Sequence, residues 1–150
     1  MTVKQQLQTD LTTAMKARDD IRLGTIRMAL TAVTNEEVAG KQSRELSDDE
    51  VLKVLARELK KRKEAASAFA DAGHADRAAA EMAEAAILDA YLPEQLGDDD
   101  LAELVRAAIK ETGAADPKQM GQVMKVVQPQ VAGRADGGRI AAEVKRQLAL

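Results

Sequence analysis

Apolar residues recur every three or four positions along almost the whole chain, which is the spacing of one face of an α-helix. Every periodic segment has this spacing, so the pattern predicts an all-α fold without a sheet. Two helices are expected before Gly40, separated near Asp19 and Asp20. Their apolar positions are Val3, Leu7, Leu11 and Met15 in the first helix and Leu23, Ile26, Leu30 and Val33 in the second.

The strongest signal for a helix start lies at Ser47. Its hydroxyl can accept a hydrogen bond from a first-turn amide, and Glu50 can complete a capping box. The helix that follows is expected to be the longest of the chain and to end near Gly73, because glycine adopts the left-handed conformation that closes many helices. A fourth, alanine-rich helix is expected over residues 75–92, packed back against the third, and Pro93 ends it.

A short polar segment, residues 93–100, is interpreted as the boundary between two regions. Residues 1–92 are expected to form an N-terminal helical hairpin region, and residues 97–150 a C-terminal three-helix module. Pro129 lies well inside the middle helix of this module, so it is expected to kink or end that helix. The three helices are expected over residues 101–112, 117–131 and 136–148.

Composition removes several kinds of chemistry. The chain has no cysteine and a single histidine, His74, which excludes disulfides, thiolate zinc sites and metal sites built from several histidines. It has no nucleophile-elbow serine and no glycine-rich nucleotide-binding loop. The acids Asp98, Asp99 and Asp100 are better explained as favourable charges at a helix N-terminus than as an acid/base pair. We therefore expect no catalytic residue, no metal and no cofactor.

Hydropathy and aromatic content constrain location and partners. No apolar run approaches the roughly 18 residues that a membrane span requires, so we expect no membrane partner and a cytoplasmic location. Phe69 and Tyr91 are the only phenylalanine and tyrosine, and there is no tryptophan. This scarcity argues against a protein that stacks exposed bases on an aromatic platform.

Positive charge is concentrated in two places. Between Lys53 and Lys63 there are six basic residues and one acid, which indicates either a solvated helix surface or a phosphate-binding one. In the C-terminal module, two arginines flank the small residues at the start of the last helix, whose amides could face an anion; the alternative is a glycine C-cap followed by an Asp136 N-cap. The candidate nucleic-acid-binding residues are Lys60, Lys61 and Lys63 in the third helix and Lys118, Lys125, Arg134 and Arg139 in the C-terminal module.

Three motifs carry a resemblance to a known family: Tyr91-Leu92-Pro93-Glu94-Gln95-Leu96, Met120-Gly121-Gln122-Val123-Met124-Lys125 and Gly133-Arg134-Ala135-Asp136-Gly137. In this order and spacing they resemble the YqeY-like family (GatB/YqeY type). The C-terminal module of that family is similar to the tail domain of the B subunit of tRNA-dependent amidotransferases. Ile26-Arg27-Met28, Asn35-Glu36-Glu37 and the basic third helix extend the resemblance over nearly the whole chain.

The resemblance implies a helical appendage that helps to hold tRNA, whereas the kinase and transamidation chemistry of the amidotransferase belongs to other domains. Our first hypothesis is therefore a non-catalytic accessory protein that binds tRNA or other structured RNA. A helical protein–protein adaptor with a protein partner is the alternative. The second alternative is a component linked to glutamine-dependent carbon–nitrogen ligase chemistry by domain homology only. The sequence does not separate the first two.

Overall fold

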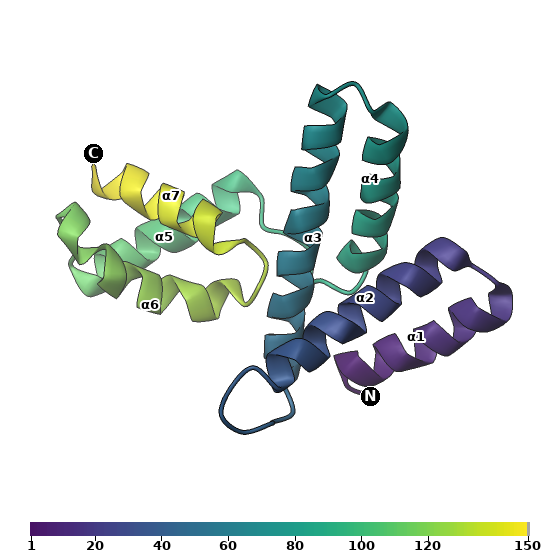
Figure 1. The fold of residues 1–150 in the computed structure, drawn as a ribbon. Coiled ribbons are helices and arrows are strands. Elements are labelled where there is room, and N and C mark those ends of the chain that lie inside the picture. The colour runs from purple at the N-terminus through teal and green to yellow at the C-terminus, as the bar shows by residue number, and fades with distance from the viewer. Residues whose placement is uncertain (150) are drawn as a thin grey trace. The chain divides into compact units, whose positions relative to one another are not determined.

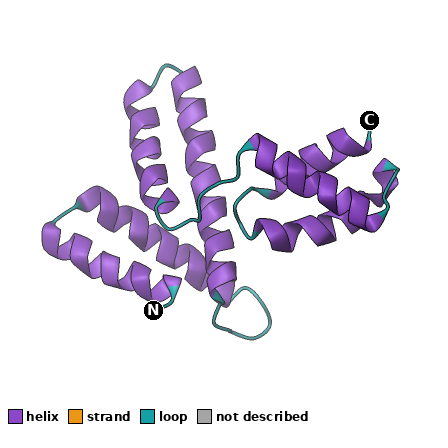
Figure 2. Cartoon of the chain, turned by 180° about the vertical axis from the view of Figure 1, so that it is seen from behind, coloured by secondary structure: helices purple, strands orange, loops and turns teal. Residues whose placement is uncertain are grey.

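The computed structural model describes residues 1–149, and in that part of the chain it contains seven α-helices, one short 3₁₀ helix and no strand (Figures 1 and 2). The predicted all-α fold is confirmed. Contacts divide the chain into two compact units, Met1–Leu92 and Pro93–Leu150. None of the helices in the described part combines the length and the apolar character needed to cross a bilayer.

Two helical hairpins form the first unit, one from α1 (Val3–Ala17) and α2 (Asp20–Glu37) and the other from α3 (Asp48–Asp71) and α4 (Ala75–Asp89) (Figure 1). Their inward stripes pack together because each helix buries apolar residues at intervals of three or four. The fully buried core of this unit includes Leu7, Ile26, Ala29, Val33, Val51, Val54, Leu55, Ala85 and Leu88.

The ends of α3 follow the sequence prediction. Ser47 and Glu50 form the expected capping box: the Glu50 amide donates to the Ser47 hydroxyl at 3.3 Å, and the Ser47 amide donates to the Glu50 carboxylate at 3.2 Å. α3 is the longest helix of the described chain, and Gly73 follows it with a left-handed φ of +81°. α4 ends at Asp89, three residues earlier than predicted, because the chain changes to turn hydrogen bonds before Pro93.

The second unit is a bundle of α5 (Asp98–Thr112), α6 (Met120–Val131) and α7 (Gly137–Leu148), with the 3₁₀ helix η1 (Pro117–Gln119) before α6. The predicted start of α5 at residue 101 was wrong: Gly97 is the N-cap, and the three following aspartates form the first turn, where negative charge is favourable. The core of this bundle includes Leu96, Leu101, Val105, Ala108, Val123, Val127, Val131, Ile140, Val144 and Leu148.

The middle segment of this unit also differs in detail from its prediction. Residues 117–119 form a tight 3₁₀ turn instead of the first turn of an α-helix, with Asp116 accepting a hydrogen bond from the Lys118 amide at 2.9 Å. Pro129 lies in the last turn of α6, which ends two residues later. Ala132 and Gly133 then adopt left-handed φ values of +50° and +79°. Pro129 is therefore found where the helix ends, one of the two outcomes expected.

Candidate nucleic-acid interface

The exposed side of α3 carries a row of basic residues. Successive residues of an α-helix are rotated by about 100°, so Lys53, Arg57 and Lys60 lie on one side, opposite the buried Leu55. All three are exposed. Lys61 is exposed on the flank of this row and approaches Glu58 at 3.3 Å. Lys63 is exposed on the opposite flank. The three lysines predicted as one site are therefore distributed around the helix, and only Lys60 lies within the row.

Arg62, in the middle of the basic run, points into the fold. Its side chain is only 12% exposed and contacts Glu58 at 3.1 Å, Glu84 of α4 at 3.4 Å and the sulfur of Met28 on α2 at 3.1 Å. It therefore connects three helices of the first unit and is not available to a ligand. A sequence signal for this existed, because Arg62 continues the apolar stripe of Leu55, Leu59 and Ala66 at helical spacing.

One member of the row already has a partner. Arg57 contacts Glu36 at the end of α2 at 3.1 Å, and both side chains are largely exposed. An ion pair of this kind contributes little to stability and exchanges readily with another anion. Among residues 1–149, no carboxylate lies within ion-pair distance of Lys53 or Lys60. The row therefore presents two unpaired cations, Lys53 and Lys60, and one ion-paired arginine to solvent, with the exposed Glu64 one turn beyond Lys60 on the same side.

The two predicted arginines of the second unit make contacts within the fold. Arg139 donates to the Leu96 carbonyl and to the Asp98 carboxylate, both at 3.0 Å. Arg134 donates from Nε to the Glu94 carbonyl at 3.3 Å. The start of α7 has its own cap, because the Asp136 carboxylate accepts from the Arg139 amide at 2.9 Å. Both features of the second predicted alternative, a glycine at the end of α6 and an Asp136 N-cap, are present in the structure.

These contacts fasten residues 93–97, which we call the strap, to the rest of the second unit. The Leu96 amide donates to the Arg134 carbonyl at 2.7 Å, and the Gln95 side chain donates to the Gly133 carbonyl at 3.4 Å. Leu96 is buried in the core of the unit. Most of the first motif of the resemblance therefore lies against the third. From the sequence these residues are predicted only as part of the boundary segment, because their partners lie about 40 residues away in the chain.

The remaining predicted cations of this unit are Lys118 in η1 and Lys125 in α6, and both are exposed. No carboxylate of the described residues lies within ion-pair distance of either ammonium group. They form a second, smaller basic surface, which belongs to the second unit, whereas α3 belongs to the first.

Two polar clusters that the sequence did not reveal stabilise the first unit. Glu37 is buried and accepts hydrogen bonds from Lys4 at 2.8 Å and from the Leu46 amide at 3.1 Å, and these bonds lower the pKa of its carboxyl. Tyr91 donates to the Asp10 carboxylate, and burial together with this bond raises the pKa of the phenol. Both clusters are explained by helix packing.

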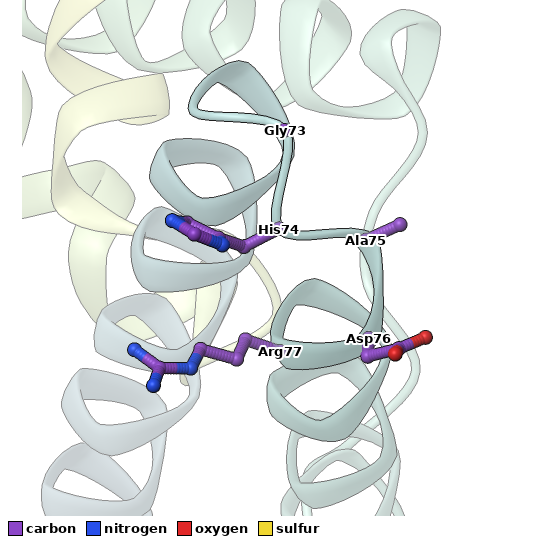
Figure 3. A pocket seen from close by; sticks show the side chains of 5 residues that line it. All are labelled: Gly73, His74, Ala75, Asp76 and Arg77. Atoms are coloured by element: carbon purple, nitrogen blue, oxygen red, sulfur yellow. The ribbon is translucent and has the colours of Figure 1, made fainter.

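A small hollow lies at the turn between α3 and α4, lined by Gly73, His74, Ala75, Asp76 and Arg77 (Figure 3). His74 and Arg77 extend to the same side, whereas Asp76 points the other way (Figure 3). The His74 ring meets the Phe69 ring edge-on at 6.3 Å, and the Arg77 guanidinium lies 5.7 Å from the centre of the same ring. Within the described residues no group of three potential metal ligands occurs. These side chains cover Phe69, the one aromatic residue of α3, which accounts for their arrangement.

Comparison with known proteins agrees with the motifs. No curated protein matched the chain. The family model described as Yqey-like protein matches residues 4–148, which is nearly the whole length and includes both units. The chain belongs to the YqeY-like family.

Proposed function

We propose that this protein is a non-catalytic accessory protein that binds tRNA or other structured RNA, and that the row of Lys53, Arg57 and Lys60 on α3 makes the main phosphate contacts. The observation that carries the proposal is the repetition of these three exposed cations on one side of a single helix. With a rise of about 1.5 Å per residue, they span about 10 Å, which allows more than one phosphate to be contacted at a time.

The mode of binding follows from the side chains available. Structured RNA is recognised mostly through its shape, its phosphates and its 2′-hydroxyls, because its deep major groove is closed to side chains. The ammonium group of lysine and the guanidinium group of arginine can bind these phosphates, so an aromatic platform is not needed. The resemblance of the C-terminal module to an amidotransferase tail supports tRNA as the class of RNA. Lys118 and Lys125 are the candidates for a secondary contact.

Arg134 and Arg139 are not part of the main contact surface that we propose. Their side chains donate to carbonyls and a carboxylate of residues 94–98, so an RNA phosphate would have to compete with bonds that fasten the strap. We therefore place the RNA contact on α3 and not at the start of α7. A link to glutamine-dependent carbon–nitrogen ligase chemistry rests on the shared domain alone and is not part of the proposal.

The test is the salt dependence of tRNA binding by three variants of the full chain that each lose two positive charges. Lys53→Gln with Lys60→Gln removes two members of the row, and Lys118→Gln with Lys125→Gln removes the secondary contact. Lys16→Gln with Lys41→Gln, at exposed sites elsewhere, is the charge-matched control. The affinity of each for labelled tRNA is measured between about 0.05 M and about 0.2 M salt.

For the row variant we expect the slope of log affinity against log salt to decrease in magnitude by about 0.7 to 0.9 for each lost contact, with the control unchanged. Equal losses in all three variants would mean that net charge alone attracts RNA, and the assignment to α3 would be wrong. Absence of salt-dependent binding by the unaltered protein would reject the RNA proposal. The adaptor hypothesis would then be preferred, and the half-exposed Met15, Ile21, Met28 and Met82 would be its first candidate contacts.

A further inference from the structure

The outer face of α5 carries four charged residues in one row. Asp99, Glu103, Arg106 and Lys110 follow each other at intervals of four, three and four residues, so they lie within about 60° of one another around the helix. All four are exposed. The opposite side of α5, with Leu101, packs into the bundle, so the row is not needed to form the core. The first half of the row is negative and the second half is positive.

The row is symmetric about its own centre. Asp99 and Lys110 are equally far from the midpoint of the row, and so are Glu103 and Arg106. A second α5 lying antiparallel across this midpoint therefore brings every acid of one helix opposite a base of the other. The helix dipole favours acids near the N-terminus and bases near the C-terminus. That preference does not require the charges to share one face or to be spaced evenly about one point.

Apolar surface is available beside the row. Ala102 and Ile109 are half-buried on the flank that faces α7, in an open hollow that also includes Arg146 and Gln147. Gln147 donates to the Ala102 carbonyl at 2.8 Å, which holds α7 against this part of α5. The floor of the hollow is therefore fixed by the fold, and a helix that lies along the row would cover it.

We propose that α5 binds a second copy of this chain through the row, with the two helices antiparallel about a twofold axis. Such an interface is isologous, since the same residues contribute from both copies. Glu103 and Arg106 already pair within the helix, but at 66% and 71% exposure, so exchanging partners costs little. One helix face is small compared with a standard interface of about 1,600 Å². The dimer is therefore weak and sensitive to salt, and it does not depend on RNA binding.

Charge reversal at the centre of the row tests the proposal. Glu103→Arg places two like-charged contacts at the centre of its own dimer, and Arg106→Glu does the same with the opposite sign. When the two variants are mixed, both central contacts become attractive again. Glu111→Arg is the matched control, because it makes the same charge change on α5 at an exposed position outside the row. Far-UV circular dichroism checks that every variant keeps its helix content.

Self-association of the full chain is measured by sedimentation equilibrium at about 0.02 M and about 1 M salt, where exposed charges are weakly and strongly screened, respectively. We expect the unaltered protein and the control to dimerise at low salt, each single reversal to raise the dissociation constant at least about tenfold, and the mixture to recover it. A monomer at low salt overturns the proposal. A dimer that neither reversal weakens, or a mixture that fails to recover, also overturns it, since the contact would then lie elsewhere.

Discussion

Replacing Arg62 with alanine tests whether one residue of the basic run belongs to the fold. Arg62 is 12% exposed and Glu58 16% exposed, so the pair is close to buried, and Glu84 adds a second carboxylate. Breaking a fully buried pair costs about 3–5 kcal/mol, whereas an exposed pair is worth about 0–1 kcal/mol. Glu58 keeps Lys61 at 3.3 Å, which offsets part of the loss. We therefore expect Arg62→Ala to lower the free energy of unfolding of the first unit by about 2–3 kcal/mol.

The assay is urea unfolding followed by tyrosine fluorescence. Tyr91 is the only tyrosine and the chain has no tryptophan, so this signal reports on the first unit. With a slope of about 1–3 kcal/mol per molar urea, the midpoint should fall by about 0.7–3 M. Arg62→Met separates the causes, because it keeps most of the packing and removes the charge.

Lys61→Ala and Lys63→Ala are the controls, and each should change the free energy of unfolding by less than about 0.5 kcal/mol. If Arg62→Ala has an effect as small as theirs, Arg62 is a surface residue in solution and the assignment of the basic run is wrong. If Arg62→Met is as destabilised as Arg62→Ala, the ion pairs carry the effect. A much smaller effect of the methionine variant would instead assign it to the packing of the side chain.

Two further predictions concern the strap and the start of α3. Arg139→Ala should destabilise the second unit by about 1–2 kcal/mol, because it removes a charged donor from the Leu96 carbonyl. The same variant should increase amide hydrogen exchange at Leu96, and unchanged exchange would contradict the role of the strap. Paired with Arg44, the Glu50 carboxyl has its pKa lowered from about 4.5 to about 2. The stability that it contributes is therefore present above about pH 4.5 and is lost as the pH falls toward 2, so Glu50→Gln should flatten the decline of the melting temperature in that window.

Local signals in the sequence accounted for the ends of several helices. The capping box at Ser47 and the glycine after α3 are each local signals, which depend only on residues near that end of the helix. Both could therefore be read directly from the sequence. The end of α4 and the 3₁₀ turn before α6 were missed, because they depend on small differences between turn and helix hydrogen bonding near a proline. Helix ends were therefore predictable where a local cap marks them, and not where turn and helix hydrogen bonding compete near a proline.

The candidate site was predictable only in part, and the reason is the distance between partners in the chain. That the third helix is basic follows from composition, and the helical repeat alone places Lys53, Arg57 and Lys60 together. The strap could not be foreseen, because Arg139 meets Leu96 only after the bundle has formed. Charge alone suggested that Arg139 was free to bind an anion.

The positions of the motif residues bear on where a ligand surface should be sought. The first motif and the motif around Arg134 hold each other, and Glu37 of the segment Asn35-Glu36-Glu37 binds Lys4 and the Leu46 amide before α3. Tyr91, which opens the first motif, is tied to Asp10. Because hydrogen bonds within each unit already use these groups, the motifs explain the family's fold better than they explain a binding surface. Lys53, Arg57 and Lys60 are exposed, lie outside these motifs and share one side of a single helix, and this is the reason to begin the search for RNA contacts there.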